Sequence, residues 1–374
     1  MAAPLVSVVV TNHNYGRFLG ESLRSALSQT WVAVEVVVVD DGSTDDSRQV
    51  IDSFTGQVKP VLQDCAGQAA AAGAGFEASS GDVVIFLDAD DVLLPSAAER
   101  AATLLSLPGA AKAHWPVETI DEQGRPLGGR FPVDPLPSGD LREWLLDVGP
   151  GAVPFPPTSG NAWTRAFLSR VMPVPGGAFA IGLDAYLAAL APLYGRVEAV
   201  EGFHSRYRLH SSSNWWGKAL RERLQLDLER DELTRFHLAE HCRALGIDAD
   251  PERWREASWF VKLSLTLDEI EPFVAGQTVV LVDDDQLGID SSLSWRAHPL
   301  REQGGVYWGP PSDDAEARAE LERAIAHGAT RLVVAWPAFW WLGHYRKFFD
   351  WVGTRFGALL MTDRVHVFDL AESL

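Results

Sequence analysis

Three aspartates lie within four residues at Asp88-Ala89-Asp90-Asp91, directly after the apolar run Val83–Leu87. A short strand that ends in three carboxylates is costly, because neighbouring carboxylates repel one another unless they are hydrated or paired. A divalent cation offsets this repulsion and prefers oxygen ligands of this kind. We therefore expect Asp88 and Asp90 to share one Mg²⁺ or Mn²⁺ at the tip of a sheet. In the alternative interpretation, Asp91 caps the next helix, where negative charge suits the helix dipole.

Two more polar clusters follow strand-like segments. Thr11-Asn12-His13-Asn14 follows an apolar run that begins at Leu5, and Asp40-Asp41 follows the run Val34–Val39. Strand and helix patterns alternate through the first hundred residues, which favours a parallel sheet with helices on both faces. Ligands bind beyond the carboxyl ends of the strands in such sheets, so the three clusters are expected to meet at one edge. Taken alone, Thr11–Asn14 or Asp40-Asp41 could be ordinary turn residues.

The elements that would position these clusters can be read from periodicity. In the first hundred residues we expect strands at 5–11, 34–39, 58–62 and 83–87, and helices at 67–78 and 95–107. Ser43 or Thr44 is expected to cap the helix that carries Ile51. Gly73 and Gly75 are expected to permit close packing. Further along, we expect irregular structure at 108–160, helices at 162–171 and 180–193, and strands at 197–200 and 203–209.

The remaining sequence changes character after residue 215. Leucines four apart among alternating charges predict an amphipathic helix over 216–245, and a second helix is expected over 252–270. From Thr278 the strand–helix pattern returns, with strands at 278–282, 331–335 and 364–368 and a helix that begins at Asp313 or Asp314. Asp283-Asp284-Asp285 is interpreted as a solvated strand end, and Trp336–Trp341 as core or interface packing. We therefore expect domains at 1–215 and 273–374, joined by a helical linker over 216–272.

Composition narrows the classes of function. The chain has 374 residues, 47% hydrophobic residues and a net charge of −19, from 32 basic and 51 acidic residues. This charge opposes nucleic-acid polymers and anionic membranes, although a cation could still mediate binding of a small phosphorylated ligand. No stretch approaches the ~20 apolar residues of a membrane span. The two cysteines, Cys65 and Cys242, form no metal or disulfide pattern, which favours the cytoplasm.

The three clusters together carry a family resemblance. The stretches SVVVTNHNYGRFLGESLRSALSQT (7–30), VVVVDDGSTDDS (36–47) and FLDADDVLLP (86–95) resemble a family 2 glycosyltransferase with the GT-A fold of nucleotide-diphospho-sugar transferases. The resemblance is strong over 4–107, weaker over 150–214, and absent from 216–374. It implies an α/β domain with a Rossmann-like mixed sheet flanked by helices. It also implies a metal-dependent inverting transfer of sugar from a nucleotide-diphospho-sugar, with a UDP-sugar as the expected donor, to a saccharide or glycoconjugate acceptor.

The resemblance also implies roles for individual residues. Thr11, Asn12, His13 and Asp41 would contact the base and ribose of the donor. Asp88 would contact the ribose and the metal, Asp90 would bind the metal, and Asp91 would lie near the metal or the acceptor. His210, in Tyr207-Arg208-Leu209-His210, would contact the diphosphate. Asp184 would be the catalytic base, although Leu183 replaces the first acid of the family's usual pair. A helix-terminal carboxylate is the plain alternative for Asp184, and a solvated loop histidine is the alternative for His210.

Two other functions remain in view from the sequence. The chain could be a non-catalytic nucleotide-sugar-binding or scaffold module, which would act through its carboxy-terminal domain. The presence of Asp88, Asp90 and Asp184 favours the enzyme. A dinucleotide-binding oxidoreductase is disfavoured, because Thr-Asn-His-Asn follows the first strand where that class has Gly-x-Gly-x-x-Gly. The loop Ser159-Gly160-Asn161 could line an acceptor pocket, and the carboxy-terminal domain could bind a partner protein or a second copy.

Overall fold

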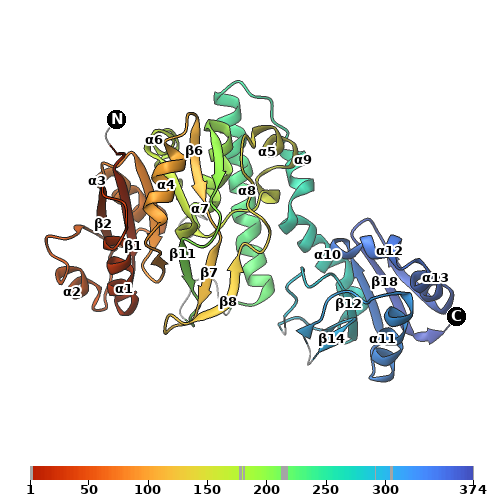
Figure 1. Cartoon of the computed structure of the whole chain (residues 1–374). Helices are drawn as coiled ribbons and strands as arrows, with labels where there is room; N and C mark the ends of the chain where they lie inside the picture. The colour runs from red at the N-terminus through yellow and green to blue at the C-terminus, as the bar shows by residue number, and fades with distance from the viewer. Residues whose placement is uncertain are drawn as a thin grey trace. The chain divides into compact units, whose positions relative to one another are not determined.

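The computed structural model describes residues 3–176, 179, 182–211, 218–290, 292–303 and 306–373 (Figure 1). The chain packs into two compact units. Unit 1 comprises Met1–Gly217 and Leu228–Ser258, and unit 2 comprises Lys218–Asp227 and Trp259–Leu374. The expected domain limits at 215 and 272 stay a prediction. None of the described helices combines the length and the apolar composition that crossing a bilayer requires.

Unit 1 is built on a seven-stranded mixed sheet in the order β10-β6-β9-β4-β1-β2-β3. Its strands are β1 (Val6–Asn12), β2 (Val34–Asp41), β3 (Lys59–Gln63), β4 (Val83–Asp88), β6 (Ala110–His114), β9 (Asn161–Thr164) and β10 (Arg196–Ala199). All neighbouring strands are parallel except β9, which runs antiparallel to both β4 and β6. The mixed α/β sheet flanked by helices is therefore confirmed, and the all-parallel sheet suggested by strand–helix alternation is corrected by β9.

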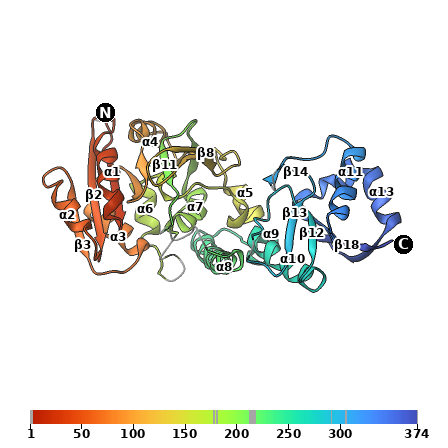
Figure 2. The same cartoon turned by 90° about the horizontal axis from the view of Figure 1, so that it is seen from below.

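Helices cover both faces of this sheet, as Figure 2 shows for α4 and α3 on opposite sides. The α-helices that lie wholly in this unit are α1 (Gly16–Leu27), α2 (Ser47–Asp52), α3 (Gln68–Ala78), α4 (Ala97–Leu105), α5 (Arg142–Val148), α6 (Arg165–Val171), α7 (Leu183–Tyr194) and α9 (Pro251–Ala257). Along β4, Ile85 and Leu87 face the core under α1 and α4, while Val84 and Phe86 face the core under α3, α6 and α7. A strand buried on both faces needs a continuous apolar run, which is why Val83–Leu87 was recognisable.

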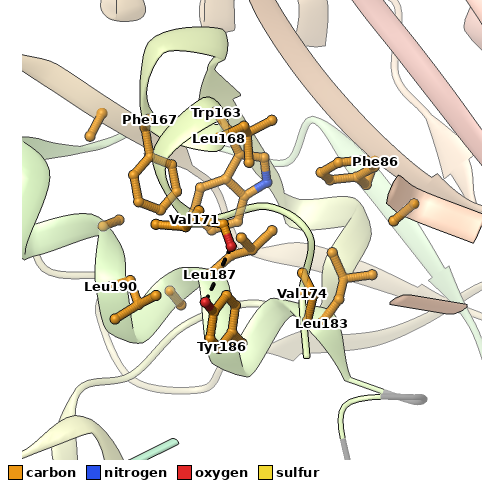
Figure 3. Packing of buried hydrophobic residues seen from close by; sticks show 14 of the residues in the cluster. Phe86, Trp163, Phe167, Leu168, Val171, Val174, Leu183, Tyr186, Leu187 and Leu190 are labelled. Atoms are coloured by element: carbon orange, nitrogen blue, oxygen red, sulfur yellow. Dashed lines mark hydrogen bonds between the residues drawn. The ribbon is translucent and has the colours of Figure 1, made fainter. Parts of the chain in front are cut away.

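The larger of these two cores is centred on aromatic side chains from β9, α6 and α7 (Figure 3). Trp163 is 1% exposed and its ring stacks at 5.7 Å from that of Phe167. Tyr186 is buried in the same core, and its hydroxyl donates a hydrogen bond to the carbonyl of Val171 at 3.2 Å. This bond satisfies the polar atom of an otherwise apolar side chain and ties α7 to the end of α6.

The segment from 108 to 171 differs from the expectation. Residues 108–160 were expected to be irregular but contain β6, α5 and two strands of a second sheet. That sheet has the order β5-β11-β7-β8, with β5 (Val92–Leu93), β7 (Val117–Ile120), β8 (Pro126–Phe131) and β11 (Ser205–Arg208). Lys112 and His114 hid the apolar pattern of β6, and the Pro and Gly of β8 are tolerated because it is an edge strand. The helix expected at 162–171 begins only at Arg165, because Ala162 and Trp163 face opposite cores as a strand does.

The helices after residue 217 also differ in part. The helix expected over 216–245 is α8 (Leu220–Ala244), and residues 216 and 217 lie outside the described residues. The single helix expected over 252–270 is two helices, α9 and α10 (Trp259–Val274), which are separated at Ser258. The break falls where the chain passes from unit 1, in which Trp254 is buried, to unit 2.

Unit 2 is a small α/β unit with the five-stranded order β13-β12-β16-β18-β17. Its main elements are β12 (Thr278–Val282), β13 (Arg296–Pro299), α11 (Asp314–Ala326), β16 (Arg331–Ala335), α12 (Trp340–His344), α13 (Arg346–Arg355), β17 (Phe356–Met361) and β18 (Val365–Ser373). Asp313 caps α11 by accepting hydrogen bonds from the amides of Ala315 and Glu316, as expected. Trp341 is 1% exposed in the core, which confirms core packing for that residue, whereas Trp340 is 47% exposed.

Candidate functional site

Strand register brings the three polar clusters to one edge of the sheet. Asn12 lies opposite Asp40 in the β1–β2 pair, and Thr11 lies opposite Asp88 in the β1–β4 pair. The Asn12 amide donates to an Asp40 carboxylate oxygen at 3.0 Å, and the Thr11 hydroxyl lies 3.4 Å from Asp88 Oδ1. The convergence expected from the carboxyl ends of the strands is therefore present in the structure.

Asp41 and His13 lie together at the end of β2. Asp41 is 3% exposed, and its carboxylate accepts hydrogen bonds from the amides of Ala66 and Gly67, both at 2.8 Å, and from the Gln63 side chain at 2.7 Å. The His13 ring donates from Nδ1 to the Asp41 carbonyl at 2.6 Å. Asp41 thus fixes the loop before α3, while the exposed His13 keeps its ring at the surface of the site.

The residues after Asp41 form a turn whose capping differs from the expectation. The amide of Ser47, at the start of α2, donates to the Asp45 carboxylate at 3.0 Å, so Asp45 and not Ser43 or Thr44 serves this helix end. The Ser43 hydroxyl instead accepts a hydrogen bond from the amide of Asn14 at 2.9 Å. Asn14 has φ +59°, a backbone conformation that asparagine tolerates better than most residues. The side chain of Ser43 is therefore used to join the turn to the loop that follows β1.

The acidic cluster is tightly held by β11. Asp90 accepts a hydrogen bond from His210 Nε2 at 2.9 Å, so the expected neighbourhood of Asp90 and His210 is present. Arg208 is 1% exposed and donates from Nε to the Asp90 carbonyl at 2.7 Å. Burial first, and repulsion from Asp90 second, raise the pKa of Asp88 to about 7. The same two causes raise the pKa of Asp91 well above its ordinary value.

Asp91 does not cap the next helix. It is 1% exposed, its Oδ1 accepts from the Arg208 amide at 2.9 Å, and helix α4 begins only at Ala97. Its other oxygen, Oδ2, is buried and has no hydrogen-bond partner among the described residues. An unsatisfied carboxylate oxygen beside two further carboxylates is the kind of donor set that a divalent cation would stabilise.

Gln68, a residue that sequence reasoning missed, links the acidic cluster to the helix end that carries Asp184. Gln68 donates from its side-chain amide to Asp88 Oδ1 at 2.7 Å, and its carbonyl oxygen accepts from the Gly182 amide at 3.0 Å. Gly182 precedes α7, whose first turn carries Asp184. Burial raises the pKa of Asp184, while the positive charge of Arg230 opposes this rise. One side chain therefore joins the acidic cluster to the helix end that carries Asp184.

Two other contributions were missed or misassigned from the sequence. From the sequence, Arg208 is only part of the segment that resembles the family, yet in the structure this residue of β11 binds the acidic loop. Ser159 is fully buried and accepts a hydrogen bond from the Asp88 amide at 3.2 Å, and Asn161 is fully buried and donates to the Pro157 carbonyl. These contacts are structural. Gln68 could have been noticed as a polar residue at the start of a small-residue helix that follows a strand.

A second group of three side chains lies close enough together to bind one metal ion. Among the described residues, ligand atoms of His13, Asp41 and Cys65 lie within 4.8 Å of one another. Both carboxylate oxygens of Asp41 already accept hydrogen bonds from the protein, and His13 Nδ1 donates a hydrogen bond to the Asp41 carbonyl. These groups are thus engaged, whereas Asp91 retains an unsatisfied oxygen.

The sequence of this chain is similar to those of known glycosyltransferases. Residues 7–153 match the model of the family "Glycosyl transferase family 2". An uncharacterized glycosyltransferase of Nostoc sp. is 35% identical over 213 residues, which cover 56% of this chain and 66% of that protein. Glycosyltransferase GlyG of Streptococcus pneumoniae is 38% identical over 93 residues, which cover 24% of this chain and 31% of that protein. The chain thus spans less than two thirds of the length of these relatives.

Two solved structures resemble this chain at a lower sequence identity. TarS from S. aureus (residues 1–349) has 16% identity and a TM-score of 0.49, with coverage of 72% of this chain and 74% of that one. The mannosyltransferase PcManGT from Pyrobaculum calidifontis, in complex with GDP-Man and Mn²⁺, has 16% identity and a TM-score of 0.48, with coverage of 73% and 76%. The family match covers β1, β2 and β4, with the three polar clusters that meet at their ends. Over residues 7–153, this chain thus matches glycosyltransferase family 2.

Proposed function

We propose that this chain transfers a sugar, with inversion, from a nucleotide-diphospho-sugar to a hydroxyl group of a saccharide or glycoconjugate. The observation that carries this proposal is the Gln68 bridge between Asp88 and the start of α7. A transferase needs its donor-binding carboxylates and its base on either side of the reacting carbon, held at a fixed separation. Gln68 supplies such a connection between Asp88 and the helix end that carries Asp184.

Asp88 and Asp90 would hold the divalent cation, Mn²⁺ or Mg²⁺, with Asp91 beside them. The fit is supported by the raised pKa values of Asp88 and Asp91 and by the unsatisfied Oδ2 of Asp91. Carboxylates that repel one another this strongly are stabilised by a cation, and Mg²⁺ typically combines one or two carboxylates with substrate phosphates. When bound, the cation would neutralise charge on the leaving diphosphate. His210, hydrogen-bonded to Asp90, would lie near the diphosphate.

Asp184 would take the proton of the acceptor hydroxyl during attack. A carboxylate whose pKa is raised by burial is a stronger base than an exposed one, and the positive charge of Arg230 opposes the rise. Thr11, Asn12, His13 and Asp41 would line the nucleoside side, as the exposed ring of His13 favours. A UDP-sugar is the proposed donor. The cytoplasm is the proposed compartment, since Cys65 and Cys242 are both free thiols.

The test separates donor binding from catalysis. Thermal unfolding is measured with UDP, GDP and dTDP, each with and without Mn²⁺, because a ligand that binds only the folded state raises its apparent stability. We expect UDP with Mn²⁺ to give the largest rise. Asp184→Asn should keep this rise but lose about 100-fold or more of the transfer rate from UDP-sugars to saccharides. Asp52→Asn, at an exposed site on α2, is the matched control.

The outcomes discriminate between enzyme and binding module. A wild-type protein that binds UDP with Mn²⁺ but transfers no sugar from any donor would favour the nucleotide-sugar-binding module. Asp184→Asn with the wild-type transfer rate would remove Asp184 from the role of base. No rise in melting temperature with any nucleotide would contradict the proposed function as a whole.

A further inference from the structure

Two buried basic side chains, Lys112 and His114, are separated by one residue on β6, away from the acidic cluster. Lys112 is 2% exposed and His114 is 1% exposed. Residues two apart on a strand point to the same face, and here that face packs against α7. A buried amine that makes no hydrogen bond to a carboxylate is unusual, because desolvation disfavours its charge. Burial accordingly lowers the pKa of Lys112 to about 7.

The hydrogen bonds of the two side chains are incomplete. The ammonium of Lys112 lies 5.2 Å from the centre of the Trp163 ring, and no hydrogen bond from it to the described residues is present. His114 donates from Nε2 to the Pro137 carbonyl at 2.8 Å, which leaves Nδ1 as the acceptor of the neutral ring. Nδ1 is buried and has no partner among the described residues. One donor and one acceptor are therefore both unsatisfied.

A small cavity lies against both groups. It has a volume of about 10 Å³, is partly open, and is lined by Lys112, His114, Phe155, Ala188, Ala189 and Pro192, among others. This volume admits about one water molecule or one hydroxyl group. A hydroxyl would complete both partners, because its oxygen accepts from Lys112 and its hydrogen is donated to His114 Nδ1. A carboxylate or phosphate oxygen would face the lone pair of His114 and fits less well.

The cavity lies along the helix whose first turn carries the proposed base. Asp184 and Ala188 are four residues apart on α7 and so share one face of that helix. The positive charge of Lys112 also lowers the pKa of Asp184, although burial and Arg230 act more strongly. His114 ends β6, which runs in the same direction as β4 because β9 is antiparallel to both. Its carboxyl end therefore lies at the same edge of the sheet as Asp88.

We propose that Lys112 and His114 bind one hydroxyl group of the acceptor saccharide and so select the acceptor. This inference rests on the proposed function, because it assigns the acceptor side of the same site. A site built to hydrogen-bond a hydroxyl rejects an analogue that lacks it, since two buried polar groups are then left unpaired. The hydroxyl bound here is a recognition group, distinct from the hydroxyl that attacks the sugar.

The test compares acceptors that differ in one hydroxyl. Methyl glycosides and their monodeoxy derivatives are assayed as acceptors with wild type, Lys112→Met and the exposed control Lys347→Met. In wild type, one deoxy position should raise the acceptor KM at least about 10-fold, which corresponds to about 1.4 kcal/mol. Lys112→Met should raise the KM for the parent glycoside equally and no longer discriminate against that deoxy position. The Kd for UDP with Mn²⁺ should stay unchanged in both variants.

A second measurement needs no turnover. The ¹⁵N NMR signal of His114 Nδ1 is followed while the glycosides are added to protein saturated with UDP and Mn²⁺. A shift with the parent glycoside, and none with the discriminated deoxy compound, supports the proposal. Equal KM values for wild type and Lys112→Met on every glycoside, or an Nδ1 signal that no glycoside moves, would show that the cavity holds water only. Absence of UDP binding would instead contradict the proposed function.

Discussion

Gln68 illustrates how one neutral side chain can organise charged neighbours. Its amide group donates to Asp88 and its carbonyl accepts from the Gly182 amide, so both ends of the side chain are used. The hydrogen bond to Asp88 lowers the pKa of that carboxyl group, against the larger opposing effects of burial and Asp90. Gln68 therefore acts as a positioning residue between the acidic cluster and α7.

Replacing Gln68 by leucine should impair transfer more than folding. Gln68→Leu removes the link between Asp88 and Gly182 while keeping a side chain of similar size. Loss of a supporting hydrogen bond of this kind typically costs 10- to 100-fold in metal affinity or activity, and we expect a loss in that range. The transfer rate and the Mn²⁺ concentration for half-maximal rate report it. The exposed Gln57→Leu is the control, and wild-type values for both quantities in Gln68→Leu would refute the positioning role.

At the scale of elements, most strands of the central sheet were predictable, but β6 and β9 were not. Runs such as Val83–Leu87 are apolar throughout because both faces are buried, and this pattern is visible in the sequence. β9 is only four residues long and continues directly into α6, so no turn residue separates the two. β6 was hidden by Lys112 and His114, polar residues that are buried beside a cavity rather than exposed.

The same limit applies to the site. The ends of β1, β2 and β4 could be inferred to converge, because parallel strands end at a common edge. The contacts of Gln68 and Arg208 could not, because they join segments more than a hundred residues apart. Which residues Gln68 and Arg208 contact depends on how α7 and β11 pack against the sheet.

Helix α3 gives a matched pair of glycines with opposite expectations. A Cβ at Gly75 would lie 2.2 Å from Val9 Cγ1, whereas a Cβ at Gly73 would meet nothing nearer than Met172 Cε at 3.9 Å. Gly75→Ala should therefore lower the free energy of unfolding by about 1–3 kcal/mol through overpacking. Gly73→Ala should raise it by up to about 1 kcal/mol through better helix propensity. Urea denaturation measures both, and equal effects of the two substitutions would contradict the close packing of α3 on β1.

At the scale of the whole molecule, each unit has its own hydrophobic core. Leu87 is fully buried in unit 1 and Leu332 is fully buried in unit 2. Units with separate cores commonly unfold separately, and a ligand stabilises only the unit that binds it. The candidate site lies wholly in unit 1, so nucleotide binding should not depend on the core of unit 2.

Calorimetry should show two unfolding transitions. UDP with Mn²⁺ should raise the midpoint of one transition only, and Leu87→Ala should lower that same transition. Leu332→Ala should lower the other, since a leucine-to-alanine change in a core costs about 2–5 kcal/mol. A single transition that UDP and both substitutions move together would show that the units unfold as one.

The central claim is that Asp90 binds the cation through which a nucleoside diphosphate is held. Calorimetric titration of UDP, with and without Mn²⁺, into wild type, Asp90→Asn and the exposed control Asp134→Asn tests it most directly. We predict that Mn²⁺ tightens UDP binding at least about 10-fold in wild type and in the control, a difference of about 1.4 kcal/mol. In Asp90→Asn, UDP should bind equally with and without Mn²⁺. The wild-type gain from Mn²⁺ in a folded Asp90→Asn protein would contradict the claim.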